Sequence, residues 1–326
     1  MENLIIIGGG AAGLSAAIYA AREGMNPLVI ISIEPAGELS TASIVENYPG
    51  FPDGISGPDL IEKMRKQAVK FGSRIIYEKV TRVLLAGPPF TVQTELNTYQ
   101  CGSIIIATGA SPKWLGLPSE VEKIGRGVSS CATCDGPLYR NKVVAVVGGG
   151  DTALEYALIL SSYSSKVYVV NRSPSLRGGR TLQDRIRSDR KIEVMLNTEV
   201  VEVLGDKKVS GISVRNKALG TTQNITCDGL FIAIGERPNT DFLMGQLKLD
   251  PDGYVVTTDE VKTGIPGVYC AGDIVDKIYR QAVTAAASGV KAFFEARRFL
   301  QESGAILEGI GPTASGNENM PRSFYL

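Results

Sequence analysis

The sequence predicts an α/β fold with two Rossmann-like domains, the second inserted into the first. Three observations support this prediction: a strand, glycine turn and helix at the start of the chain, a second copy of that unit in mid-chain, and a similar closing strand in each half. The chain of 326 residues is also too long for one ordinary domain and long enough for two domains with their own cores.

The first unit begins at the N-terminus. The apolar run Leu4–Ile7 predicts a buried strand, Gly8–Gly13 predicts a tight turn, and the alanine-rich stretch Leu14–Arg22 predicts a helix. A second apolar run, Leu28–Ile31, ends near Glu34. Together these segments form a βαβ unit of the size that binds a dinucleotide.

The second unit repeats this order in mid-chain. Val143–Val147 predicts a strand, Gly148–Ala153 a turn, and the stretch from Leu154 to Ser161 a helix. The run Val167–Val170 predicts the strand that follows. We therefore expect an internal duplication, with two dinucleotide-binding domains of the three-layer ββα sandwich type.

The closing segments predict how the two domains are connected. Ile104–Gly109 and Leu230–Gly235 are similar apolar strands at corresponding places, and Gly267–Asp273 with the helix Ala282–Leu300 indicates that the first domain resumes after the second. We expect the first domain at 1–113 and 244–308, the inserted domain at 114–243, and a C-terminal tail at 309–326. The tail ends in Phe324-Tyr325, whose aromatic rings could stack on a bound cofactor or a partner, with an unstructured tail as the alternative.

Composition excludes several classes of partner. Lys plus Arg (34) equals Asp plus Glu (34), without a basic cluster, so we expect no nucleic-acid partner and no attraction to an anionic membrane. No stretch approaches the ~20 apolar residues of a membrane span. The N-terminal apolar run carries Glu2 where a signal peptide has basic residues. We therefore expect a cytoplasmic protein without membrane insertion.

The absence of histidine limits the possible chemistry. It excludes histidine acid/base catalysis, Ser-His-Asp triads and most zinc sites. The five cysteines are an odd number and do not suit a structural disulfide framework. Cys101, Cys227 and Cys270 lie on predicted strands and are interpreted as buried packing residues.

Cys131 and Cys134 form a CxxC pair just ahead of the second unit. A zinc site needs four ligands, and there is neither a histidine nor a second CxxC, so the pair predicts a redox disulfide instead. Disulfide exchange also needs a proton donor, for which Asp135 is the nearest ionisable group. The alternative role for Asp135 is a helix cap or turn former.

The two glycine turns predict dinucleotide sites. In such a turn the first glycine permits the bend, the second admits a pyrophosphate to backbone amides, and the third allows helix and strand to pack closely. Gly8, Gly10 and Gly13 occupy these positions in the first turn, with Glu34 as the expected ribose acceptor. The second turn is the GxGxxA variant, and its alternative interpretation is a domain that kept its fold and lost its ligand.

Over about residues 3–305 the chain resembles the low-molecular-weight thioredoxin reductases, which are FAD-dependent class II pyridine nucleotide-disulfide oxidoreductases. The resemblance rests on five separated motifs in the same order. They are Cys131–Gly136, Val45–Phe51, Ala107–Ala110, Leu115–Pro118, and Ala271–Asp273 with Tyr279–Ala282.

The resemblance implies a dithiol/disulfide oxidoreductase with FAD, a thioredoxin-like or other dithiol protein as partner, and a homodimer. It implies that Cys134 faces the flavin, that Cys131 attacks the partner disulfide, and that Asp135 transfers protons. The FAD-binding residues that it implies are Gly8, Gly10, Ala11, Ala12, Gly13, Glu34, Gly37, Glu38, Leu39, Asn47, Val80, Ala107, Thr108, Gly109, Gly272, Asp273, Arg280, Gln281 and Ala282. Those of the second dinucleotide site are Gly148, Gly150, Asp151, Thr152, Arg172 and Arg177.

The second site departs from the pattern of relatives that use NADPH. They carry His-Arg-Arg and a further Arg four residues later, where this chain has Asn171-Arg172-Ser173 and then Arg177. Ser173 cannot clamp a 2′-phosphate, and Asn171 is not the acid that an NADH site would have. Three hypotheses stay open: altered NADPH use, electrons supplied by a protein such as ferredoxin, or a second FAD.

Two further alternatives concern the flavin and the overall function. Glu38 stands where relatives usually have glutamine, and a charge there would lower the flavin potential unless the side chain faces solvent. Ferredoxin-NADP reductases of the same fold lack the cysteine pair. A flavin-binding redox sensor with a conformational output is the rival outside enzymology.

Overall fold

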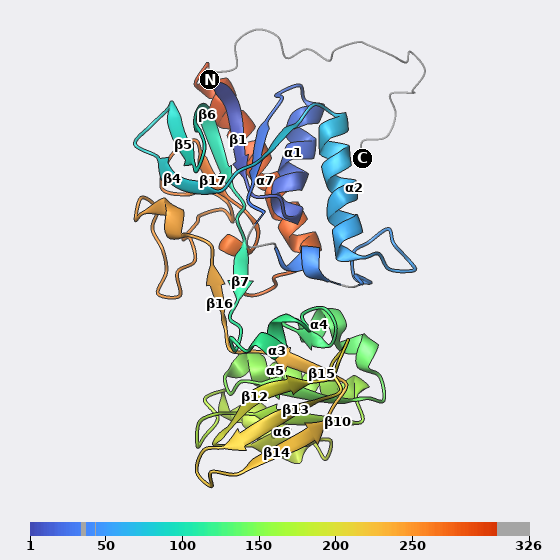
Figure 1. Cartoon of the computed structure of the whole chain (residues 1–326). Helices are drawn as coiled ribbons and strands as arrows, with labels where there is room; N and C mark the ends of the chain where they lie inside the picture. Colours follow the sequence, from blue (N-terminus) through green and yellow to red (C-terminus); the bar gives the residue numbers. More distant parts are fainter. Residues whose placement is uncertain (34–36, 43, 305–326) are drawn as a thin grey trace. The chain divides into compact units, whose positions relative to one another are not determined.

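Figure 1 shows the computed structural model, which describes residues 1–33, 37–42 and 44–304. The chain divides into two compact units. Unit 1 consists of Met1–Glu34, Glu62–Gly109 and Thr240–Leu326, and unit 2 of Pro35–Ile61 and Ala110–Asn239. The boundaries expected from the sequence stay a prediction, and the C-terminal tail lies outside the described residues.

Unit 1 contains a seven-stranded sheet in the order β3-β2-β1-β6-β5-β4, with β17 also paired to β6. The pairs β1–β2, β2–β3, β1–β6 and β6–β17 are parallel, whereas β4, β5 and β6 form an antiparallel meander. The strands are β1 (Glu2–Ile7), β2 (Leu28–Ile31), β3 (Arg74–Tyr77), β4 (Val80–Leu84), β5 (Phe90–Thr94), β6 (Thr98–Ile106) and β17 (Val268–Cys270).

Helices α1 (Ala11–Arg22) and α7 (Ala282–Glu302) pack against each other in unit 1 (Figure 1). Residues at alternate positions of β1 point to opposite faces of the sheet, and Leu4 and Ile6 are as fully buried as Ile5. Both faces are therefore covered, which is why this strand is apolar throughout rather than alternating. The other helical segments that reach unit 1 are α2 (Gly57–Lys70), η3 (Asp241–Leu243) and η4 (Gly272–Ile274).

Unit 2 has a parallel sheet in the order β11-β10-β9-β15-β8, a three-stranded antiparallel sheet β12-β13-β14, and a two-stranded pair β16-β7. Its strands are β7 (Ala110–Pro112), β8 (Val128–Ser129), β9 (Val143–Val147), β10 (Lys166–Val170), β11 (Ile192–Met195), β12 (Thr198–Leu204), β13 (Gly211–Asn216), β14 (Thr222–Thr226), β15 (Gly229–Ile232) and β16 (Glu236–Pro238). Its helical segments are η1 (Glu38–Thr41), α3 (Pro118–Val121), α4 (Ala132–Asp135), η2 (Gly136–Tyr139), α5 (Asp151–Tyr163) and α6 (Arg180–Ser188).

The core of unit 2 shows three layers. Val144 and Val146 of β9 share a buried cluster with α5 residues such as Leu154. Ala145 and Val147 share a second cluster with residues of the antiparallel sheet. Since neighbouring residues of one strand face opposite sides, the parallel sheet lies between helices and a second sheet. The predicted α/β class with Rossmann-like architecture is confirmed.

The internal duplication is visible in the strand order of the two units. The series β3-β2-β1-β6-β17 of unit 1 has the same order and parallel direction as β11-β10-β9-β15-β8 of unit 2. Two of the predicted strands, β2 and β9, have the predicted bounds. Two of the three predicted helices begin earlier than expected, at Ala11 and Asp151, because each starts directly after the second glycine of its motif, which is the N-cap.

One sequence-based expectation was wrong. Cys227 was expected on a strand, but it lies between β14 and β15, where its backbone N–H reaches the carbonyl of Ser210 at 3.4 Å. The side chain is buried nonetheless, like those of Cys101 and Cys270. In residues 1–33, 37–42 and 44–304 we find no helix long and apolar enough to span a bilayer.

Candidate active site

The first glycine turn, between β1 and α1, has the geometry of an anion-binding turn. Gly8 has φ +120°, and an added Cβ would lie 2.2 Å from the carbonyl oxygen of Ala107. A Cβ on Gly13 would lie 2.0 Å from the Gly8 carbonyl oxygen, whereas nothing lies within 4 Å of one on Gly10. The N-cap Gly10 is exposed, so the N-terminus of α1 can offer backbone N–H groups to a phosphate, and these residues fit the pyrophosphate of FAD.

Three segments that are far apart in sequence meet at this turn in unit 1. The backbone N–H of Ala107 donates to Ile7 at 2.7 Å, which places Ala107, Thr108 and Gly109 directly beyond β6 and next to Gly8. Gly272 in η4 has φ +76°, and its added Cβ would lie 2.9 Å from the Ala12 Cβ. The carboxyl ends of parallel strands thus converge, as expected for a ligand site of this fold, with Asp273 next to Gly272.

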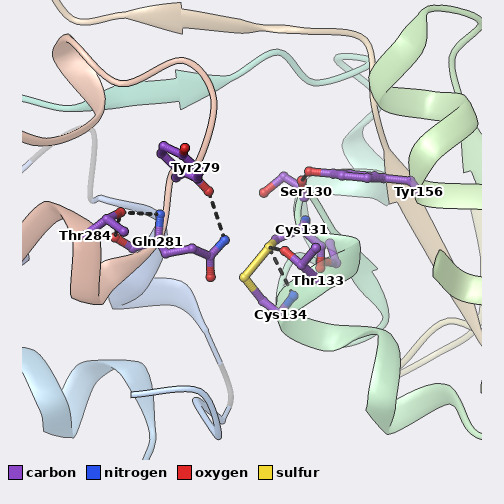
Figure 2. The surroundings of a disulfide bond; sticks show 9 residues. Ser130, Cys131, Thr133, Cys134, Tyr156, Tyr279, Gln281 and Thr284 are labelled. Atoms are coloured by element: carbon purple, nitrogen blue, oxygen red, sulfur yellow. Dashed lines mark hydrogen bonds between the residues drawn. A yellow bond between two sulfur atoms is a disulfide. The ribbon is translucent and has the colours of Figure 1, made fainter. Parts of the chain in front are cut away.

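Gln281 lies at the N-terminus of α7 as its cap. Its side chain accepts from the Thr284 backbone, and the Thr284 hydroxyl accepts from the Gln281 backbone N–H at 3.3 Å, as Figure 2 shows. Arg280 adopts a left-handed conformation with φ +47°, and Ala282 is the first residue of α7. The predicted FAD residues Gln281 and Ala282 therefore also determine where α7 begins.

The remaining residues predicted for FAD are distributed more widely. Val80 begins β4, which β5 and β6 separate from β1 in the sheet of unit 1. Gly37, Leu39 and Asn47 lie in the first segment of unit 2: Gly37 is the N-cap of η1, Leu39 lies within η1, and Asn47 follows it. Glu38 belongs to η1, and its expected effect on the flavin stays a prediction. Glu34 lies outside the described residues.

Cys131 and Cys134 form a disulfide, with their Cα atoms 5.3 Å apart. Cys131 is the N-cap of the single-turn helix α4, and its Sγ accepts from the backbone N–H of Cys134 at 3.2 Å. The Thr133 hydroxyl oxygen lies 3.2 Å from the same sulfur (Figure 2). The predicted pairing of these cysteines is therefore present.

The backbone that carries Cys131 is held from two sides. The N–H of Cys131 donates to the Ser129 hydroxyl oxygen at 3.0 Å. The Tyr156 hydroxyl, on α5, donates to the Ser130 carbonyl at 2.9 Å (Figure 2). Ala132, between the cysteines, is fully buried in the cluster that α5 completes. The pair is thus fixed to the helix that carries the second glycine turn.

Asp135 has the electrostatic properties of a proton donor. Burial raises the pKa of the Asp135 carboxyl above its usual range, and a hydrogen bond with the Ser129 hydroxyl opposes this shift in pKa. This direction of shift is the one that favours the protonated form of a carboxyl group. Because Asp135 also ends α4, the catalytic and structural interpretations of this residue are compatible.

The second glycine turn repeats the geometry of the first. Gly148 has φ +145°, and its added Cβ would lie 2.3 Å from the Ala233 carbonyl oxygen. Ala153 replaces the third glycine and is fully buried. Nothing lies within 4 Å of a Cβ on Gly150, so the N-terminus of α5, which begins with Asp151 and Thr152, is also open to a phosphate.

The loop after β10 is bonded to this turn. The buried Asn171 side chain donates to the carbonyls of Ser173 at 3.2 Å and Ser175 at 2.9 Å. The Arg177 backbone N–H donates to the Gly149 carbonyl at 2.6 Å, and the Gly179 backbone N–H donates to the Asp151 carboxylate at 2.6 Å. Asn171 therefore serves the loop itself and does not reach outward to a ribose.

Two cationic side chains of the second site stay accessible. Arg172 and Arg177 are both exposed, whereas the site lacks a guanidinium at Ser173. These two arginines can attract a phosphate, but without the bidentate clamp of adjacent arginines.

Sequence reasoning missed three residues near the cysteine pair. Thr133 and Ser129 lie within two positions of Cys131, and a search for hydroxyl groups next to the CxxC motif would have found them. No sequence signal points to Tyr156, because its contact with Ser130 depends on how α5 packs. Among residues 1–33, 37–42 and 44–304 there is no group of three or more His, Cys, Asp and Glu side chains that could hold a metal ion.

The chain is similar to known proteins over most of its length. A family described as pyridine nucleotide-disulphide oxidoreductase matches residues 2–289. The thioredoxin reductase of Rickettsia prowazekii (strain Madrid E) is 47% identical over 305 residues, which cover 92% of this chain and 98% of the relative.

Two solved structures are similar over nearly the whole chain. The thioredoxin reductase of Streptococcus pyogenes MGAS5005 has a TM-score of 0.88 and 38% identity, with 93% of this chain and 99% of that chain covered. The thioredoxin reductase of Giardia duodenalis has a TM-score of 0.86 and 38% identity, with 92% and 98% covered.

Proposed function

The chain belongs to the pyridine nucleotide-disulphide oxidoreductase family, and from this premise we propose that it works as a thioredoxin reductase. As a member of this family it is an FAD-dependent dithiol/disulfide oxidoreductase. The proposed reaction passes an electron pair from NADPH through FAD to the Cys131–Cys134 disulfide and on to the disulfide of a thioredoxin-like protein. The observation that supports it most directly is the disulfide itself, formed within a CxxC pair beside a half-buried acid.

We propose that the first glycine turn holds FAD, which would supply two-electron transfer when bound. Gly8, Gly10 and Gly13 shape the turn, and the N–H groups at the start of α1 bind the pyrophosphate. Ala11, Ala12, Ala107–Gly109, Gly272 and Asp273 complete the site within unit 1. The roles of Gly37, Glu38, Leu39, Asn47, Val80 and Arg280–Ala282 rest on the family resemblance.

The cysteine chemistry then follows from the residues of this chain. Reduction of the disulfide takes up two electrons and leaves Cys134 and Cys131 as thiol and thiolate. The Cys131 thiolate attacks the partner disulfide and forms a mixed disulfide, and Asp135 protonates the partner sulfur that leaves. Cys134 next gives its proton to the Asp135 carboxylate and attacks the sulfur of Cys131, which reforms the internal disulfide and releases the second partner sulfur as a thiolate.

The ligand of the second site is proposed as an adenine dinucleotide bound by Gly148, Gly150, Asp151, Thr152, Arg172 and Arg177. NADPH is the first candidate, because pyridine nucleotides are the substrates named in the family description. A second FAD, or electron supply by a ferredoxin-like protein, is the rival. Two observations favour the rival: Asn171 is used within its own loop, and Ser173 offers no guanidinium for a 2′-phosphate.

We further propose a homodimer in the cytoplasm. The dimer rests on the family resemblance, and the location on the lack of a signal-peptide pattern and of a long apolar stretch in the sequence. Size-exclusion chromatography with light scattering measures the dimer directly, and a monomeric mass at micromolar concentration would contradict it.

One experiment tests the function and separates the rival donors. Flavin per chain is measured in the purified protein, which is then titrated anaerobically with NADPH and followed at the flavin absorbance. One flavin that bleaches stoichiometrically, with subsequent reduction of thioredoxin, supports the proposed enzyme. Two flavins, or one flavin that NADPH does not bleach, support the rival donor.

The control for disulfide chemistry is Cys134→Ser. This variant is expected to bind FAD normally and to lose reduction of the partner disulfide. Unchanged turnover in Cys134→Ser would overturn the proposal and favour a flavin-binding redox sensor.

A further inference from the structure

Two hydrogen-bond donors converge on the sulfur of Cys131. The backbone N–H of Cys134 and the hydroxyl of Thr133 each lie 3.2 Å from Cys131 Sγ (Figure 2). A disulfide sulfur carries no hydrogen, so the hydroxyl must be the donor in this pair. The same sulfur becomes a thiolate when the disulfide is opened.

We propose that Thr133 is a catalytic residue, whose hydroxyl stabilises the thiolate of Cys131 after the disulfide opens. The inference rests on the proposed function for its role in turnover, but the contact itself is independent of that function. A hydrogen bond to an anionic sulfur is stronger than one to a neutral sulfur, because the acceptor carries a full charge. The bond therefore lowers the pKa of the Cys131 thiol.

The surrounding elements make such a donor necessary. The titratable groups on α4, which follows Cys131, and on the segments packed against α4 are Asp135 on α4, Tyr139 on η2, and Asp151, Glu155, Tyr156 and Tyr163 on α5. Within α4, η2 and α5 there is no lysine or arginine, and the whole sequence has no histidine. The cationic neighbours that usually lower a thiol pKa are therefore missing from these segments, and Asp135 and Glu155 would raise it when ionised.

The local fold places the hydroxyl without any rearrangement. Thr133 and Cys134 follow Cys131 on one turn of α4, whose entry is fixed by Ser129 and Tyr156. The Thr133 side chain is exposed, so its hydroxyl is not required to fill the core. An exposed hydrogen bond of this kind is expected to change the thiol pKa by about one unit, which is about tenfold in thiolate fraction.

The test uses the full-length flavoprotein with Cys134→Ser, so that Cys131 is a free thiol. The other cysteines are buried, and burial raises the pKa of Cys101 and of Cys227 to about 12. The rate of iodoacetamide alkylation at Cys131 is measured by mass spectrometry from pH 5 to pH 10. Each rate profile gives the pKa of the Cys131 thiol.

Two matched variants are compared in this background. Thr133→Val has nearly the same shape without the hydroxyl, and it is expected to raise the Cys131 pKa by about one unit and slow alkylation below that pKa about tenfold. Thr133→Ser keeps the hydroxyl and is expected to retain the original pKa. An unchanged pKa in Thr133→Val, or an equal rise in both variants, would overturn the inference.

Failure of the inference is distinguishable from failure of the proposed function. Alkylation needs neither an electron donor nor a protein partner, so the thiol pKa is measurable even if NADPH and thioredoxin prove to be the wrong substrates. Flavin content and the melting temperature of Thr133→Val, expected to equal those of the parent, verify that the variant is folded. If the flavin content or melting temperature of Thr133→Val differs from that of the parent, Thr133→Ala replaces it in the comparison with Thr133→Ser. The same difference in the Cys131 pKa is then expected.

Discussion

The contact between α7 and α1 at Gly289 leaves no room for a methyl group. A Cβ on Gly289 would lie 2.0 Å from the carbonyl oxygen of Ala12 and 2.7 Å from its carbonyl carbon. This is about 1 Å inside the 3.0 Å below which real Cβ atoms are essentially never found. Because the obstacle is backbone, Gly289→Ala must separate the two helices, and overpacking of this kind costs about 3 kcal/mol.

This loss is large enough to measure by thermal unfolding. For a unit of roughly 150 residues, about 3 kcal/mol lowers the Tm by about 6–12 °C. The same displacement moves the N-terminus of α1, so Gly289→Ala is also expected to retain less FAD. Unfolding is followed by circular dichroism at saturating FAD, so that both proteins start fully bound, and any loss of FAD affinity then adds to the fall in Tm.

Gly264→Ala is the matched control for this experiment. Gly264 is exposed, and nothing lies within 4 Å of a Cβ added there. Its melting temperature is expected to stay within about 2 °C of the parent, since surface substitutions of this kind change stability by about 0.5 kcal/mol or less. If Gly289→Ala melts at the same temperature as Gly264→Ala and binds FAD equally, the packing argument is refuted.

Three further predictions concern the charge of Asp135, the second glycine turn and the buried carboxylate of Glu120. Burial raises the pKa of Asp135, so the folded chain binds this proton more tightly and loses stability as the pH rises from about 3.8 through the folded pKa. Asp135→Asn should therefore be more stable than the parent in urea unfolding at pH 7. The same variant should turn over about 100-fold more slowly. Equal or lower stability would contradict this. Gly150→Ala should keep the Tm of the parent and bind dinucleotide at least about tenfold more weakly by calorimetry. Gly149→Ala should lower the Tm, because its Cβ would lie 2.5 Å from the Asn171 side-chain oxygen. A lower Tm in Gly150→Ala than in Gly149→Ala would be evidence against this geometry. The Glu120 carboxylate accepts from the backbone N–H groups of Leu115 at 3.0 Å and Gly116 at 2.9 Å, and Glu120→Ala leaves both without this acceptor. The substitution should lower the free energy of unfolding in urea by about 2–3 kcal/mol. A loss under about 1 kcal/mol would be inconsistent with the structure.

Much of the candidate site was predictable from local sequence. Gly8, Gly10 and Gly13 were assigned a bend, an open approach and a close packing contact, and the structure gives each residue that geometry. The CxxC pair was predicted to form a disulfide, and it does. These predictions succeeded because glycine and cysteine at fixed spacing have few physical alternatives.

Other parts of the site could not be predicted in this way. The sequence indicated only that Asn171 is not the acid of an NADH site. In the structure its side-chain amide donates to two carbonyls of the loop that is hydrogen-bonded to Gly149. Tyr156 showed no sequence signal, yet it holds Ser130 beside the cysteine pair. The role of Tyr156 depends on how α5 packs, and that of Asn171 on the conformation of its own loop; no periodic pattern in the sequence indicates either.

The sequence by itself determined the strands, helices and glycine turns of the two βαβ units, their duplication and the redox chemistry of the cysteines. It could do so because hydrophobic period, glycine spacing and thiol chemistry act over a few neighbouring residues. Only the tertiary structure decided the order of strands in each sheet, the fit of Gly289 against Ala12, and the donors that surround Cys131 Sγ. These depend on where packed segments meet in space, and packing is set by the shapes of many side chains at once.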